Sequence, residues 1–177
     1  MDRLSPSSLW QRAAAAQATA AAVGFVRRAI PAVESLEAVF DRVVTDPTLV
    51  TTTRSLFVDG YYALAVEEAF KCVNNMVKRK AGSGDDGANL MRTVFSANKP
   101  ILHFNAFRTP SEKNQQQGYM DIFAGCMVGI RNPRAHEHSY MDEPHVAIEM
   151  LAWANHLVRM VSKAKRARSR TKKAGTP

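Results

Sequence analysis

Residues 57–78, FVDGYYALAVEEAFKCVNNMVK, contain the clearest helical pattern of the chain. Apolar residues recur there at intervals of three and four, as on one face of an α-helix. They form two adjacent stripes, one of Phe57, Tyr61, Leu64, Ala65, Cys72 and Met76, the other of Val58, Tyr62, Val66, Phe70, Val73 and Val77. Two apolar stripes predict neighbours on two sides of the helix, as at the centre of a helical bundle.

The residues before this helix predict a second helical segment. Residues 10–44 are rich in alanine and carry apolar residues at helical spacing, with an interruption at Pro31. Asp46 and Pro47 are expected to open a connection that runs through Val50 and the three threonines that follow it. We therefore expect residues 1–50 to form a helical extension that precedes the main domain.

The residues after the central helix predict two further long helices. A short helix is expected around Leu90–Phe95, and residues 100–108 contain a candidate strand without a partner in the sequence. Thr109, Pro110 and Glu112 form a capping box for the next helix. Pro133 is expected to end that helix, because the residue before a proline is disfavoured in the α conformation. A final helix starts near Glu143. The prediction is an all-α fold, an antiparallel bundle of four or five helices over residues 51–162.

The charge of the chain is concentrated at its C-terminal end. Its 177 residues carry 24 basic and 16 acidic groups, a net charge of +8. Seven basic residues lie between Lys163 and Lys173; subtracting them from the 24 leaves 17 basic residues, which nearly balance the acidic ones. Residues 163–177 are therefore expected to form an unstructured basic tail that either contacts polyanions or only aids solubility.

The composition also indicates a soluble, cytoplasmic protein. The longest uncharged stretch, residues 13–26, is too short and too weakly apolar to span a bilayer, and it makes a poor signal peptide. Two cysteines, Cys72 and Cys126, are too few for a disulfide framework and are expected to be buried thiols.

One segment concentrates the chemistry, namely Arg131-Asn132-Pro133-Arg134-Ala135-His136-Glu137-His138. A histidine can transfer protons near neutral pH, and an arginine can hold the charge of a phosphorane-like transition state. An asparagine amide can orient either group. These residue types suit metal-independent cleavage of RNA, in which a histidine assists attack by the 2′-hydroxyl. The alternative is that Arg131 only complements the helix dipole and that the histidines are exposed loop residues.

A metal site is the main alternative to metal-independent RNA cleavage in this region. His136, His138 and His145, with Asp142 and Glu143, contain ligand types but lack the paired spacing typical of tetrahedral sites. We expect no metal and no cofactor. His103 and His156 are expected to be structural, whereas Glu68 falls on the apolar side of its helix and has Arg131 as a candidate partner.

The segment resembles the signature of the HEPN superfamily, in which an arginine is followed after four to six residues by a histidine. The residue after the arginine is typically polar there, as Asn132 is here. The sequence is most similar to one branch, the Ymh family of conserved hypothetical proteins. The resemblance covers about residues 54–163 and rests on Gly60-Tyr61, Asp86-Gly87 with Leu90-Met91 and Phe95, Gly118-Tyr119, Gly129-Ile130-Arg131-Asn132-Pro133 and Ala135-His136-Glu137.

The resemblance implies a compact helical homodimer and the activity of a metal-independent endoribonuclease, a toxin or an effector of abortive infection against phage. It implies Arg131, His136 and Asn132 as catalytic residues. Arg134 and His138 match no position of the motif and are candidates for phosphate contacts. RNA is the expected substrate, and an antitoxin or defence protein is an expected partner.

Two other classes of function are alternatives to an endoribonuclease. The first is a non-catalytic dimeric module that binds a protein or senses a nucleotide. The second is a DNA-binding protein, which is disfavoured because no helix of the body carries a clear set of base-reading residues.

Overall fold

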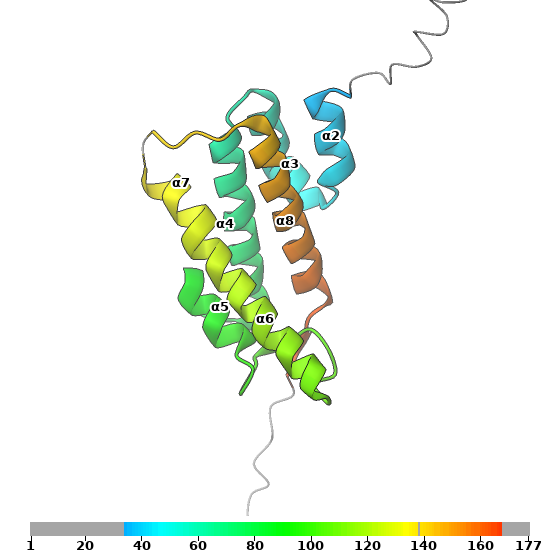
Figure 1. The fold of residues 1–177 in the computed structure, drawn as a ribbon. Helices are drawn as coiled ribbons and strands as arrows, with labels where there is room; N and C mark the ends of the chain where they lie inside the picture. Colours follow the sequence, from blue (N-terminus) through cyan, green and yellow to red (C-terminus); the bar gives the residue numbers. More distant parts are fainter. Residues whose placement is uncertain (1–33, 138, 168–177) are drawn as a thin grey trace, which may run out of the picture. The chain divides into compact units, whose positions relative to one another are not determined.

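The computed structural model describes residues 34–137 and 139–167, and they form an all-α bundle, as predicted (Figure 1). The N-terminal extension up to residue 33, His138 and the tail from residue 168 lie outside the described residues. The elements follow one another as α2 (Leu36–Val43), α3 (Pro47–Val58), α4 (Tyr62–Ala81), α5 (Gly87–Phe95), β1 (Leu102–His103), α6 (Pro110–Cys126), the π-helical turn η1 (Met127–Arg131), α7 (Asn132–His136), α8 (Pro144–Lys163) and β2 (Lys165–Arg166).

The three long helices α4, α6 and α8 alternate in direction along the chain (Figure 1). As a result, α4 and α8 run the same way and pack against each other. Their ends are joined because Lys80 Nζ donates to the carbonyl oxygens of Val161 and Ser162 at 2.8 and 2.7 Å. A lysine is favourable there, since the last carbonyls of a helix lack partners within the helix.

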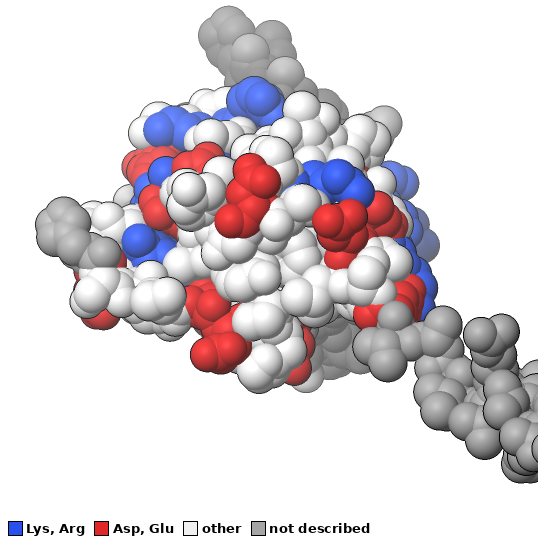
Figure 2. All heavy atoms as spheres, turned by 90° about the horizontal axis from the view of Figure 1, so that it is seen from above, with Lys and Arg blue, Asp and Glu red and all other residues white. Residues whose placement is uncertain are grey.

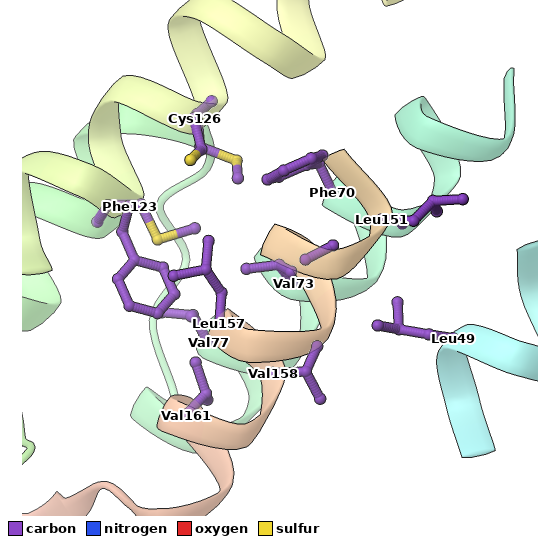
Figure 3. Close-up of a cluster of buried hydrophobic side chains, with 14 of the residues drawn as sticks. Leu49, Phe70, Val73, Val77, Phe123, Cys126, Leu151, Leu157, Val158 and Val161 are labelled. Atoms are coloured by element: carbon purple, nitrogen blue, oxygen red, sulfur yellow. The ribbon is translucent and has the colours of Figure 1, made fainter. Parts of the chain in front are cut away.

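The core lies between these helices and α3. Its side chains point toward one another in Figure 3 and include Leu49, Phe70, Val73, Val77, Phe123, Cys126, Leu151, Leu157, Val158 and Val161. One stripe of the predicted central helix, from Val66 to Val77, is fully buried. The other stripe is only partly covered: Tyr61 and Leu64 remain 61% and 41% exposed.

The connection predicted at residues 46–53 is wrong, because α3 occupies it. Asp46 caps this helix by accepting hydrogen bonds from the backbone N–H groups of Thr48 and Leu49, and Pro47 occupies its first turn. The three threonine hydroxyls bond to carbonyl oxygens one turn earlier, which satisfies them within the helix. The stripe through Phe57 is likewise interrupted, since Gly60 adopts a φ of 83° and separates α3 from α4.

Residues 36–50, which we assigned to the N-terminal extension, contribute to the bundle core. Phe40, Val44 and Leu49 are at most 1% exposed. The buried amide of Asn155 on α8 reinforces this region, because its Oδ1 accepts hydrogen bonds from the N–H groups of Thr45 and Asp46 at 3.0 and 2.9 Å.

The candidate strand at residues 100–108 finds its partner in the basic tail. Leu102 and His103 pair with Arg166 and Lys165 in an antiparallel ladder. Ala164 is buried in the core, and the N–H of Ala167 donates to the Ile101 carbonyl at 2.9 Å. Residues 163–167 are therefore part of the fold, which corrects the expectation that an unstructured tail starts at residue 163.

The predicted helices around Leu90–Phe95, from Pro110 onward and from about Glu143 are confirmed as α5, α6 and α8. Helix α5 buries all four of its apolar residues from Leu90 to Phe95, and α6 begins with the predicted capping box of Thr109 and Glu112. Within the described part of the chain, no helix combines the length and the apolar character that a bilayer span requires.

Candidate functional site

The Arg131–Glu137 segment continues a long helix instead of leaving it, which corrects the predicted helix end at Pro133. Helix α6 passes into the π-helical turn Met127–Arg131, and α7 follows directly as Asn132–His136. The residue before the proline, Asn132, remains helical at φ −63° and ψ −43°, and its N–H donates to the Met127 carbonyl, five residues earlier.

The π-helical turn explains how the helix passes the proline. In an α-helix, a proline removes one hydrogen bond and its ring collides with the carbonyl four residues earlier. A π-helical turn changes the hydrogen-bond register just before Pro133, so that the proline falls in the first turn of α7, where no N–H is required. Turns of this kind are frequent at functional sites.

Arg131, Asn132 and His136 lie in different environments. Arg131 and Asn132 are half-buried, whereas His136 is exposed at the end of α7. The Nε atom of Arg131 is buried without a hydrogen-bond partner among the described residues. Arg131 and His136 lie close together in the sequence on η1 and α7. Among the described residues, however, no hydrogen bond joins their side chains.

Arg134 is not available for a phosphate, contrary to the prediction. Its guanidinium binds both oxygens of Asp142 at 2.6 Å, and each side chain is only 4% exposed. Its remaining terminal nitrogen donates to the Ile130 carbonyl at 2.7 Å, and its Cζ atom lies 4.7 Å from the centre of the Tyr140 ring. Arg134 therefore fastens α7 and η1 to the loop before α8.

This buried ion pair was not predicted, because Asp142 was considered only as a metal ligand. No spacing rule connects two residues across a loop, and the only available signal was that a buried carboxylate needs a cation. Arg131, the candidate partner of Glu68, does not pair with it among the described residues; Glu68 instead pairs with Lys71 at 2.8 Å. Lys71 also pairs with Glu67, four residues earlier on the same helix, at 2.8 Å.

The remaining histidines divide into two groups. The Nε2 atom of His156 forms a hydrogen bond with the Tyr119 hydroxyl, which supports its structural assignment, and the Nδ1 atom of His103 lies within hydrogen-bond distance of the Asn105 carbonyl. His145 is exposed on the first turn of α8. No group of three or more potential metal ligands gathers among the residues that the structure describes.

The cysteines differ in their surroundings. Cys126 is buried, and burial raises the pKa of its thiol to about 11. Cys72 is half-buried and its Sγ contacts the Thr52 hydroxyl at 3.6 Å. A thiol with a raised pKa is a poor nucleophile at neutral pH, so Cys126 is a packing residue.

An open groove of about 410 Å³ lies beside the Arg134–Asp142 pair. It is lined by residues 60–64 at the start of α4 and residues 140–144 before α8. Figure 2 looks at this end of the bundle and shows acidic and basic side chains interspersed, without a continuous basic patch on the face in view. The groove wall is largely apolar, since Tyr61, Leu64 and Met141 are exposed.

The described residues thus define an all-α bundle protein. Its Arg131–His136 segment lies at the C-terminal end of the continuous helical stretch formed by α6, η1 and α7. Residues 44–161 match the family model described as Protein of unknown function (Hypoth_ymh). The match covers more than half of the chain, so the protein belongs to this family, and the resemblance to the Ymh family is confirmed. No curated protein and no solved structure matches the chain.

Proposed function

We propose that this protein is a metal-independent endoribonuclease of the HEPN type, acting as a toxin or as an effector of abortive infection against phage. The observation that supports this most is the state of Arg131. A buried guanidinium nitrogen without a partner is costly, and such groups in native proteins call for an explanation. Binding of an anionic group of the substrate at Arg131 is such an explanation.

In the proposed reaction, His136 moves a proton at the attacking or leaving oxygen, and Arg131 stabilises the negative charge of the phosphorane. The 2′-hydroxyl attacks the neighbouring phosphorus, the 5′-oxygen leaves with a proton, and a 2′,3′-cyclic phosphate remains. Asn132 orients one of these groups. His138 remains a candidate phosphate contact from its place in the sequence.

We further propose that the active form is a homodimer. The site is incomplete within one chain, because no described residue orients His136. Gly125 and Gly129 offer an open surface on the same helical unit, since a Cβ atom added at either would meet no atom within 4 Å. Light scattering is expected to report a dimer at micromolar concentration; a monomer that retains activity contradicts this assembly.

The decisive experiment is incubation of the purified full chain with total cellular RNA, in the presence and absence of EDTA. Cleavage is expected to persist with EDTA, to spare DNA and to leave cyclic phosphate ends. His136→Ala is expected to reduce the rate roughly a hundredfold to ten-thousandfold, as is typical for loss of a general acid or base. Arg131→Lys is expected to retain only part of the activity, because a lysine lacks the forked donors of arginine.

His145→Ala is the matched control, since this histidine is also exposed but lies on α8. It is expected to leave the rate unchanged. If EDTA abolishes cleavage, a metal mechanism replaces the proposal. If RNA remains intact under all conditions, the alternative is favoured: a non-catalytic dimeric module for protein binding or nucleotide sensing.

A further inference from the structure

The opposite end of the bundle contains a small pocket that the proposed reaction does not use. Its volume is about 230 Å³, and it is lined by His103, Phe104, Asn105, Ala106, Lys163 and Lys165. The pocket lies where α8 ends and the chain turns into β2. Since α8 has 20 residues, this point is about 30 Å from the start of α8 near Asp142.

The short sheet places a histidine and a lysine of this pocket side by side. His103 and Lys165 are direct partners in the antiparallel register of β1 and β2. Side chains of directly opposed residues project from the same face of a sheet, with their Cβ atoms roughly 5 Å apart. Lys163, the last residue of α8, lines the same pocket.

The positive charges of the two lysines are not compensated. Neither Lys163 nor Lys165 forms an ion pair within the described ranges, whereas Lys71 and Lys78 each contact a carboxylate. The Nδ1 atom of His103 lies 2.6 Å from the Asn105 carbonyl, which only accepts hydrogen bonds. The Nε2 atom of His103 makes no hydrogen bond to any described residue.

The loop that forms the other wall of the pocket is rigidly held. Asn105 Nδ2 donates to the Glu112 carbonyl and to Gln115 Oε1, and its Oδ1 accepts from the Phe107 N–H. Phe107 adopts a φ of 59°, a conformation that non-glycine residues rarely take. A wall fixed before binding reduces the ordering cost that a ligand must overcome.

We propose that this pocket binds a phosphate group of a nucleic acid backbone. Two ammonium groups match the charge and the acceptor oxygens of a phosphodiester, and the imidazole of His103 lines the same pocket. The sequence favours a strand over a lone ion, because four further basic residues follow β2 in the sequence, namely Arg168, Arg170, Lys172 and Lys173. This site goes beyond the proposed cleavage and does not depend on it.

The test measures binding of a short fluorescein-labelled single-stranded RNA to the full chain by fluorescence anisotropy. All proteins carry His136→Ala so that cleavage does not interfere. The double variant Lys163→Gln/Lys165→Gln is expected to bind about tenfold more weakly. The slope of log K against log salt is expected to become shallower by roughly 0.7 per lost contact.

The matched control is Lys99→Gln/Lys113→Gln, which removes the same charge from exposed lysines that do not line the pocket. It is expected to have a clearly smaller effect. A DNA strand of the same sequence is expected to lose affinity to the same degree as RNA. A loss confined to RNA overturns backbone phosphate as the recognised group.

A second measurement leaves the pocket intact, in case the double variant does not fold. The imidazole signals of His103, followed by NMR, are expected to shift when RNA or inorganic phosphate is added to the His136→Ala protein. The proposal is overturned if these signals stay unchanged, if the double variant binds RNA normally, or if the control pair is equally weakened. None of these results bears on whether the protein cleaves RNA.

Discussion

The two ends of the bundle use their charges in opposite ways. At the end of α7, Arg134 and Asp142 are almost fully buried and neutralise each other. Where α8 ends, Lys163 and Lys165 are exposed and have no anionic partner in the described part of the chain. The first arrangement supports the fold, because removing one member leaves a buried charge. The second contributes little to the fold and leaves its charge available for a ligand.

This contrast shows that the position of an arginine in a motif does not reveal its role. Arg131 and Arg134 are three residues apart, yet Arg134 is saturated by Asp142 and Ile130, whereas Arg131 keeps a buried nitrogen without a partner. The net charge is equally uninformative about the location of a binding surface. Two of the basic residues between Lys163 and Lys173, namely Lys163 and Lys165, line a pocket.

Replacement of Arg134 is expected to cause the largest loss of stability. Arg134→Met is expected to lower the free energy of unfolding by about 3–5 kcal/mol, since the Asp142 carboxylate stays buried without a counter-charge. Urea denaturation followed by circular dichroism measures the change. Lys163→Gln, at the other end, is expected to change it by less than about 0.5 kcal/mol.

A double variant provides the control for this prediction. Arg134→Met/Asp142→Leu removes both charges, and it is expected to recover most of the stability, because an apolar pair often replaces a buried ion pair without loss. If Arg134→Met is no more damaging than Lys163→Gln, the ion pair does not hold this end of the bundle.

Two truncations of the C-terminal end test how much residues 164–167 contribute to the stability of the fold. Removal of residues 168–177 is expected to leave the unfolding free energy unchanged. Removal of residues 164–177 is expected to cost roughly 1–3 kcal/mol, since it deletes the β2 ladder, the Ala167–Ile101 hydrogen bond and the buried Ala164. Thermal unfolding of the two truncated chains, compared with the full chain, tests the difference.

The smallest expected effect concerns the loop beside the pocket. Hydrogen bonds from the N–H groups of Arg108 and Thr109 hold the pKa of Glu112 below its ordinary value of 4.5. The stabilisation is therefore present above the ordinary pKa and is lost as the pH falls through the lowered, folded-state value. Glu112→Gln is expected to flatten the acid side of the curve of stability against pH, measured by urea unfolding. An unchanged curve contradicts the assignment.

The regular parts of the fold were predictable from the sequence because they depend on local patterns. Helical spacing located α4, α5, α6 and α8, and the capping box located the first turn of α6. The pattern at residues 46–53 indicates a connection, whereas the threonine hydroxyls there bond within the helix α3. The ladder of β1 and β2 joins residues too far apart in sequence for any local pattern to predict it.

The candidate site was predictable only as a segment. Sequence spacing located Arg131, Asn132 and His136, but the rule for residues before proline placed them at a helix exit. The partner of Arg134 depends on the loop that returns to α8, which no residue pattern encodes. The pocket at His103 likewise requires the register of two strands.

The π-helical turn at Met127–Arg131 also acts as a phase shift. A turn that takes one additional residue rotates everything after it by about 100° around the helix axis, relative to an uninterrupted α-helix. Without that rotation, the inward place that Arg134 occupies falls to Pro133, which has no charge to offer Asp142. The orientation of α7, and with it the direction in which His136 faces, is thus set by one extra residue in the turn before it.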